Sequence, residues 1–222
     1  MNRAEVTPSD RLIFLGDYVD GWSESDKVID LLIELGRTRD CLFIRGNHDQ
    51  LFADWLHHPT ENLLWLKHGG QATIDAYLPL PDSKKKEHLH FLENLTNYHI
   101  DSQNRLFVHA GFSSLHGPEI EYHDTAYYWD RTLWETALAV NPDMPLTDPR
   151  YPKRLLLFNK IFIGHTPTTR IDSTLPVTAA CVTNIDTGAA FKGPLTVMDV
   201  DSGEFWQSDP VCSLYPDENG RN

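Results

Sequence analysis

Two apolar runs of the chain are each followed by residue types that bind metal ions or transfer protons. The runs cover residues 12–15 and 41–44, and each is typical of a buried parallel strand. The polar residues that follow them are Asp17, Asp20, Asn47 and His48. Because open α/β sheets bind ligands beyond the carboxyl ends of their strands, we expect these four side chains to meet at one crevice.

Two further strand-like runs, 105–108 and 160–163, end at His109 and His165. With Asp17 and Asn47, these histidines supply a carboxylate, an amide oxygen and two imidazoles. Such a mixed set suits Mn, Fe or Zn better than Ca or Mg, which favour oxygen ligands. A single histidine after a strand is more often just hydrogen-bonded at the start of a loop, but four such strand ends together favour a metal site.

The rest of the chain alternates helical and strand-like patterns within one predicted domain, 1–222. Helices are expected over residues 23–36, 50–57, 61–67, 71–98 with a break at 79–81, and 125–140. Strands are expected over 180–186, 195–200 and 204–206, the last two joined by a hairpin turn at 201–203. Residues 112–158 form an aromatic and proline-rich insert expected to overhang the site, with 141–152 as a candidate lid, and 216–222 are expected to fray.

The composition limits the partners. A formal charge of −13 opposes binding to nucleic acid or to an anionic membrane surface. Three cysteines without a Cys-x-x-Cys pair give no disulfide framework, and no run is long enough to cross a bilayer. We therefore expect a cytoplasmic protein.

Four motifs, in order, carry a resemblance to a known family. They are Gly-Asp-Tyr-Val-Asp at 16–20, Gly-Asn-His-Asp at 46–49, Val-His-Ala-Gly at 108–111 and Gly-His-Thr at 164–166, with Ile-Asp-Thr-Gly at 185–188 as a common bacterial feature. Over residues 10–206 the chain resembles the bacterial type of the phosphoprotein phosphatase (serine/threonine) branch of the calcineurin-like metallophosphoesterases. That resemblance implies an α/β (α+β sandwich) fold with four α-β-β-α layers.

The resemblance also implies roles for the strand-end residues. Asp17 would bridge two divalent ions, most simply Mn2+, with Fe or Zn as alternatives, and Asn47, His109 and His165 would complete the shell of the second ion. The two ions, about 3.5–4 Å apart, would activate a bridging water for attack on phosphorus. His48 would protonate the leaving alcohol, and Asp20 would orient its ring.

Phosphate binding is implied for Asn47 and for Arg131, which lies in a Trp-x-Arg element at 129–131. The planar fork of an arginine suits two phosphoryl oxygens. A salt bridge on an aromatic helix explains Arg131 equally well, and Arg45 is similarly ambiguous. Asp49 receives no chemical role.

The remaining histidines give no second metal site. His57, His58, His88 and His90 are expected on exposed helical faces. His116 and His123 are read as loop residues because Gly111, Gly117 and Pro118 forbid a continuous helix there.

The chain departs from the family pattern in two places. Gly21 and Trp22 stand where relatives usually carry Arg-Gly, so one phosphate-binding arginine is missing. The opening Gly-Asp-x-His-Gly motif, whose Asp and His hold the first metal, has no counterpart. One hypothesis is a true start codon upstream of Met1. The other is a chain that binds one ion or none, lacks the first strand and helix, and exposes a sheet edge that would favour a dimer.

These features are compatible with three functions. The first is a metal-dependent phosphoester hydrolase acting on phosphorylated proteins or small phosphoesters. The second is hydrolysis of a dinucleoside polyphosphate such as diadenosine tetraphosphate on the same site. The third is a non-catalytic pseudo-phosphatase.

Overall fold

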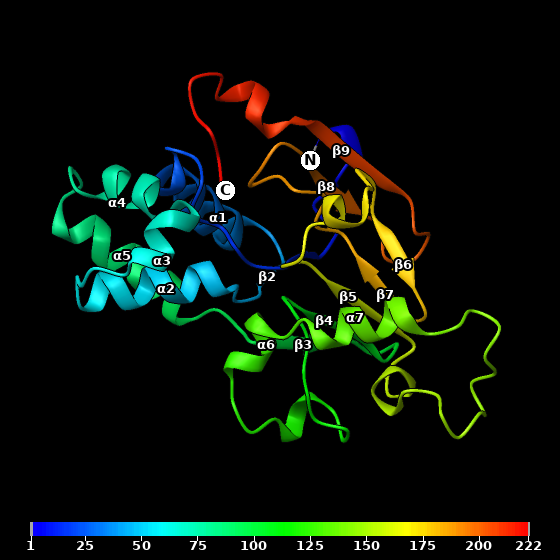
Figure 1. Ribbon diagram of the computed structural model, residues 1–222. Coiled ribbons are helices and arrows are strands. Elements are labelled where there is room, and N and C mark those ends of the chain that lie inside the picture. The colour runs from blue at the N-terminus through cyan, green and yellow to red at the C-terminus, as the bar shows by residue number, and fades with distance from the viewer. Residues whose placement is uncertain (1, 222) are drawn as a thin grey trace.

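The computed structural model describes residues 2–221 (Figure 1). The helices are α1 (Ser25–Thr38), α2 (Asn47–His57), α3 (Leu63–Trp65), α4 (Gln71–Tyr77), α5 (Asp82–Glu93), α6 (Thr125–Trp129) and α7 (Thr132–Ala139). The strands are β1 (Leu12–Phe14), β2 (Cys41–Phe43), β3 (Tyr98–Ile100), β4 (Arg105–Val108), β5 (Lys160–Ile163), β6 (Val177–Ala179), β7 (Val182–Asn184), β8 (Pro194–Met198) and β9 (Phe205–Pro210).

The strands form a parallel pair β1-β2, a five-stranded sheet in the order β3-β4-β5-β7-β6, and the antiparallel hairpin β8-β9. Within the five-stranded sheet, β4, β5 and β7 run parallel, with Arg105 opposite Lys160. The ends of β4 and β5 therefore lie side by side, and the amide of Gly164 donates to the carbonyl of His109 at 2.8 Å. This register places two of the strand-end histidines at the same edge of the sheet.

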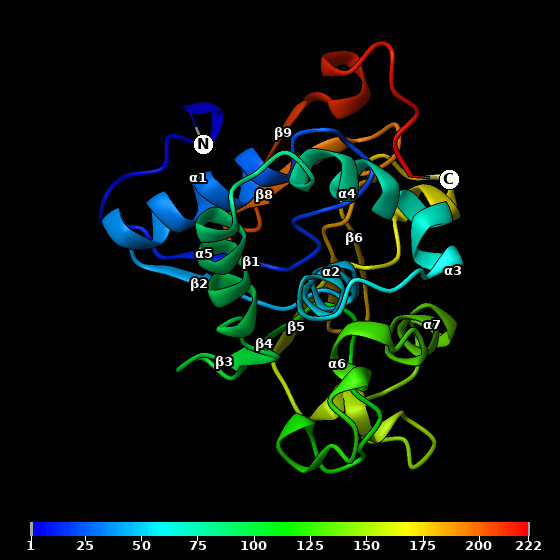
Figure 2. The ribbon, with the colours of Figure 1, turned by 90° about the vertical axis from the view of Figure 1, so that its left-hand side faces the viewer.

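Side chains that alternate along the strands divide the core into layers. Phe107 and Phe162 point from the large sheet towards Ile44 and the β1-β2 pair, whereas their neighbours pack under α6 and α7. The other face of β1-β2 packs on α1, α2, α4 and α5 (Figures 1 and 2). Helices, two layers of strands and helices again give the four-layer α-β-β-α arrangement. Each large apolar side chain buried in it contributes about 1.5–3 kcal/mol.

Several expected element boundaries differ from those in the structure, and two of the differences have a clear local reason. Helix α1 runs past Gly36 because that glycine lets the helix lie against Phe43, whose ring would be 3.1 Å from a Cβ there. The helix expected over 125–140 is split because the Asp130 carboxylate accepts from the amides of Thr132 and Leu133 and starts α7 anew. The helical pattern up to residue 98 ends earlier, and Tyr98 begins β3.

Residues 216–221, which were expected to fray, make hydrogen bonds to distant parts of the chain. The amide and hydroxyl of Ser23 donate to the Glu218 carboxylate at 2.9 and 2.6 Å, and the amide of Arg221 donates to the carbonyl of Ala190 at 2.8 Å. In Figure 1 this segment, in red, descends from β9 towards the α1 side of the molecule. Residue 222 lies outside the described residues. Among residues 2–221 no helix combines the length and apolarity needed to cross a membrane.

Candidate active site

The four strand-end residues with metal-binding side chains lie together. The Asn47 Oδ1 atom is 2.9 Å from Nδ1 of His165 and 3.3 Å from Nε2 of His109. The same Nε2 atom is 3.4 Å from Oδ1 of Asp17. The ends of β1, β4 and β5 and the first turn of α2 thus converge on one group of donor atoms.

The imidazole of His109 has its tautomer fixed by the backbone. Its Nδ1 atom lies 2.6 Å from the carbonyl oxygen of Leu15, which can only accept, so Nδ1 carries the proton. The lone pair is then on Nε2, which faces Asn47 and Asp17. A histidine with one nitrogen bonded to a backbone carbonyl and the other turned to a donor cluster has the usual arrangement of a metal ligand.

The imidazole of His165 is neutral. Burial and the neighbouring His109 lower the pKa of His165 to about 3, which leaves the ring uncharged at neutral pH. Its Nε2 atom accepts from Nε of Arg131 at 3.3 Å, and Trp129 lies edge-on to its ring. A neutral ring is the form that can bind a metal ion.

Backbone strain occurs at three residues of the site. Asp17, Asp20 and His165 have φ angles of 61°, 78° and 65°, in the left-handed region that side chains other than glycine rarely adopt. Gly16 is required for a different reason, since a Cβ there would lie 2.5 Å from the amide nitrogen of Gly46. The two motifs are packed backbone to backbone, and such strain persists where the fold holds functional side chains in place.

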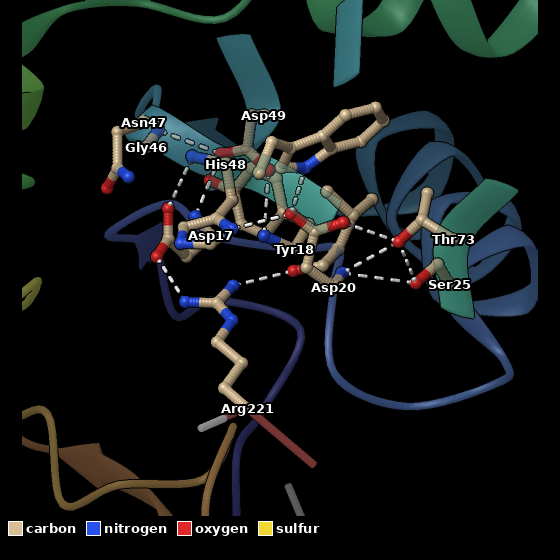
Figure 3. Close-up of polar contacts among 12 residues, drawn as sticks. Asp17, Tyr18, Asp20, Ser25, Gly46, Asn47, His48, Asp49, Thr73 and Arg221 are labelled. Atoms are coloured by element: carbon tan, nitrogen blue, oxygen red, sulfur yellow. Dashed lines mark hydrogen bonds and ion pairs between the residues drawn. The ribbon is translucent and has the colours of Figure 1, made fainter. Parts of the chain in front are cut away.

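His48 forms a buried pair with Asp20. Its Nδ1–H donates to Oδ2 of Asp20 at 2.5 Å, and that carboxylate also accepts from the indole of Trp65 at 2.6 Å and the hydroxyl of Thr73 at 2.6 Å (Figure 3). The Asp20 side chain is fully buried, so its position is fixed. Within residues 2–221 no protein group pairs with Nε2 of His48.

Asp49 has a structural function that the sequence did not suggest. Its carboxylate accepts from the amides of Asp17, Tyr18 and Gly46, each at 2.8 Å (Figure 3). Burial and the negative charge of Asp17 raise the pKa of Asp49 to about 8, although the three amide donors favour its ionised form. Asp49 ties the loop after β1 to the start of α2.

The donor set fits a divalent ion. Burial alone would raise the pKa of Asp17, but the neighbouring imidazole of His109 and the guanidinium of Arg221 outweigh it and lower that pKa far below the usual range. Asp17 is therefore ionised, and one carboxylate, one amide oxygen and two imidazoles are donors that Mn, Fe or Zn accept.

Arg221 is the residue of this cluster that the sequence did not reveal. Its guanidinium donates to Oδ2 of Asp17 at 2.8 Å and to the carbonyl of Val19 at 2.7 Å. The one available signal was Gly21, where relatives usually carry arginine. A Cβ at position 21 would lie 3.1 Å from Cγ of Arg221, so the side chain of Arg221 fills that space.

The two candidate phosphate-binding arginines differ in where they lie. Arg131 is exposed and contacts His165, so the structure brings it to the donor cluster. The guanidinium of Arg45 instead donates to the side chain of Gln50 and to the backbone carbonyls of Glu93 and Leu95. This guanidinium is thus bonded to protein groups, and a phosphate-binding role for it stays a prediction.

One of the four histidines expected on exposed faces is misplaced. His88 is fully buried between Tyr77 and Asp30, whereas His57, His58 and His90 are exposed. The insert 112–158 touches the cluster through Trp129 and Arg131, while the 141–152 loop lies beyond α7 (Figure 1). A hollow of about 950 Å³ beside that loop contains none of the cluster residues.

The sequence profile of the calcineurin-like phosphoesterases matches residues 3–187, and the chain belongs to that family. It is a hydrolase of the metallophosphoesterase class, a family whose members use divalent metal ions. The chain is 27% identical over 200 residues to the asymmetrical bis(5'-nucleosyl)-tetraphosphatase PrpE of Geobacillus thermodenitrificans, covering 85% of this chain and 74% of that protein. The PrpE of Bacillus mycoides is 29% identical over 194 residues, covering 84% and 74%.

Solved structures agree on the fold. A crystal structure provisionally named as a diadenosine tetraphosphatase matches with a TM-score of 0.61 and 17% identity, over 93% of this chain and 84% of that one. A serine/threonine phosphatase from Saccharomyces cerevisiae matches with a TM-score of 0.51 and 15% identity, over 93% and 72%. At these identities the likeness concerns the fold alone.

Proposed function

We propose that this chain hydrolyses a dinucleoside tetraphosphate such as diadenosine tetraphosphate with the help of a divalent metal ion. The observation that carries the proposal is the pairing of the donor cluster with His48, a buried histidine whose Nε2 atom is unpaired among the described residues. The names of the PrpE relatives support this substrate over a phosphorylated protein.

In the proposed site, Asp17, Asn47, His109 and His165 hold the metal ion, with Mn2+ the first candidate. A bound ion would supply Lewis acidity towards phosphoryl oxygens and lower the pKa of an attacking water. Attack of water on one phosphorus forms a new P–O bond and breaks the bond to the leaving phosphate, so that asymmetrical cleavage gives ATP and AMP.

His48 is proposed to protonate the leaving oxygen from Nε2. Asp20 accepts from Nδ1–H, which fixes the ring orientation and stabilises the protonated imidazole. Because Asp20 is itself held by Trp65 and Thr73, the ring cannot turn away.

Arg131 is proposed to bind substrate phosphate. Nε2 of His165 accepts from Arg131, so the His165 proton is on Nδ1 and donates to Asn47. Use of that Nδ1 atom as a metal ligand would move the proton to Nε2, which could then no longer accept from Arg131. The guanidinium would be released to a phosphoryl group, which its planar fork suits.

The test compares substrates on the purified chain with Mn2+. Diadenosine tetraphosphate, a phosphoserine peptide and p-nitrophenyl phosphate are each incubated, and products are separated by ion-exchange chromatography. We expect ATP and AMP from the first at a rate far above phosphate release from the others. Preferred hydrolysis of the peptide would support the protein-phosphatase alternative, and no turnover of any substrate would support the non-catalytic one.

A further inference from the structure

The side chain of Arg221 reaches the donor cluster from the end of the described chain. Its guanidinium bridges Oδ2 of Asp17 and the carbonyl of Val19, and 8% of the side chain is exposed (Figure 3). Among residues 2–221, no group accepts a hydrogen bond from its buried Nε–H. A desolvated cation with an unpaired donor is costly, so the negative surroundings must hold it in place.

The two oxygens of Asp17 have different neighbours. Oδ1 accepts from the amide of His48 at 3.1 Å and faces Nε2 of His109 at 3.4 Å, on the side of the donor cluster. Oδ2 is bonded to Arg221 at 2.8 Å. The carboxylate of Asp17 therefore presents one oxygen to the candidate metal ligands, while its other oxygen is bonded to the guanidinium of Arg221.

The fold provides a slot for this arginine. A Cβ at Gly21 or at Gly69 would lie 3.1 Å from Cγ of Arg221, so both glycines leave room for its stem. The segment before it is anchored separately, since Tyr215 stacks on Trp22 and its hydroxyl donates to Glu24 at 2.9 Å, while Glu218 accepts from Ser23. Neither the slot nor these anchoring contacts involve the charge of Arg221. A substitution can therefore remove that charge and leave the contacts of the segment in place.

We propose that Arg221 is an internal cation that competes with the divalent metal ion for Asp17, so that metal binding and docking of the 211–221 segment oppose each other. This inference rests on the proposed metal site. A guanidinium and a divalent ion on one carboxylate repel each other strongly in a buried site, where screening is weak. By linkage, metal binding must loosen Arg221 by the same factor by which Arg221 weakens the metal.

The direct test is the dissociation constant of Mn2+, measured by titration calorimetry on the metal-stripped full chain. Arg221→Gln, which keeps polarity and removes the charge, should bind Mn2+ about tenfold more tightly or better. Arg221→Lys, which keeps the charge, should stay nearer to the wild type. Arg150→Gln removes the same charge from an arginine whose side chain is 80% exposed, and it should leave the constant within about twofold.

A second measurement uses the unaltered chain and so does not depend on the variants folding. Hydrogen exchange of the peptide that contains the Arg221 amide, which is bonded to Ala190, should speed up when Mn2+ is added. An unchanged exchange rate at saturating Mn2+ would overturn the competition.

The outcomes separate this inference from the proposed function. Equal or weaker Mn2+ binding by Arg221→Gln, with Mn2+ bound by the wild type, overturns the role of Arg221 and leaves the metal site standing. Mn2+ binding by Arg221→Gln but not by the wild type supports the competition in its strongest form. Absence of Mn2+ binding in every variant overturns both the metal site and the inference.

Discussion

His48 and His88 are both buried imidazoles that pair with an aspartate, yet their surroundings lead to different chemistry. His48 uses one ring nitrogen for Asp20 at 2.5 Å, and its other nitrogen has no protein partner among residues 2–221. His88 uses both, with the hydroxyl of Tyr77 at 2.6 Å and the carboxylate of Asp30 at 2.9 Å. A histidine with both nitrogens satisfied is a structural link between α4, α5 and α1.

The acidic groups around the two histidines differ in the same way. Asp30, Glu87 and His88 offer ligand atoms within 4.8 Å of one another, which by proximity alone would suggest a metal site. However, the ammonium of Lys84 lies 2.5 Å from Asp30 and 3.0 Å from Glu87. In this outer cluster the cation contacts both carboxylates, whereas in the donor cluster Arg221 contacts only Oδ2 of Asp17 and leaves Oδ1 facing Nε2 of His109. Free lone pairs, more than proximity, separate a ligand site from a salt-bridge cluster.

The largest expected effect separates the two histidines by turnover. His48→Asn should reduce hydrolysis of diadenosine tetraphosphate by about 10²–10⁴-fold while Mn2+ still binds, because it removes the proton donor and keeps the metal shell. His88→Asn should lower the melting temperature, since that ring is fully buried, and leave turnover per folded molecule close to the wild type. A His48→Asn chain as active as the wild type would remove the assigned role.

The next effect separates the two clusters by metal affinity. Asn47→Ala removes the oxygen on which both imidazoles converge and should weaken Mn2+ binding by about 100-fold, as measured by calorimetry. Asp30→Ala, in the outer cluster, should leave the affinity unchanged. If the two substitutions weakened binding equally, the ion would have to lie elsewhere.

A smaller effect concerns the arginine beside the donor cluster. Arg131→Gln should raise the KM for diadenosine tetraphosphate by about tenfold with a modest change in kcat, since a charge-assisted contact to phosphate is lost. Arg150→Gln, on an exposed loop position, serves as the charge-matched control and should leave KM unchanged. If both substitutions raised KM equally, Arg131 would act only through the net charge of the protein.

The smallest effect tests the outer cluster through its pH dependence. Partial burial would raise the pKa of Asp30, but Lys84 and His88 outweigh it and lower that pKa below 3.8. The ionised carboxylate therefore stabilises the fold above pH 3.8, and this stabilisation is lost as the pH falls through the lowered pKa. Asp30→Asn should cost about 0.5 kcal/mol at pH 7, because the pair is half-exposed, and the difference in urea midpoint should shrink in acid. A difference that grows in acid would contradict the assigned sign.

The strands are predicted best where the local sequence pattern agrees with how the strand packs in the folded chain. The runs ending at His109 and His165 are buried on both faces of a parallel sheet, so their apolar character is continuous and their ends are abrupt. The prediction failed where a glycine had a packing function, as at Gly36 in α1, and where a polar helix face was covered by another helix, as at His88. In both cases the deciding contact comes from a distant segment.

For the candidate site, the sequence by itself determined which side chains follow the strands and hence their types of chemistry, because the carboxyl ends of parallel strands share one edge. Only the tertiary structure decided which of them have free lone pairs. It turned Arg45 towards Gln50, gave Asp49 three backbone donors, and brought Arg221 across 204 positions of sequence to Asp17. Hydrogen bonds and ion pairs between remote segments leave no periodic trace in the chain, so those contacts appear only once it is folded.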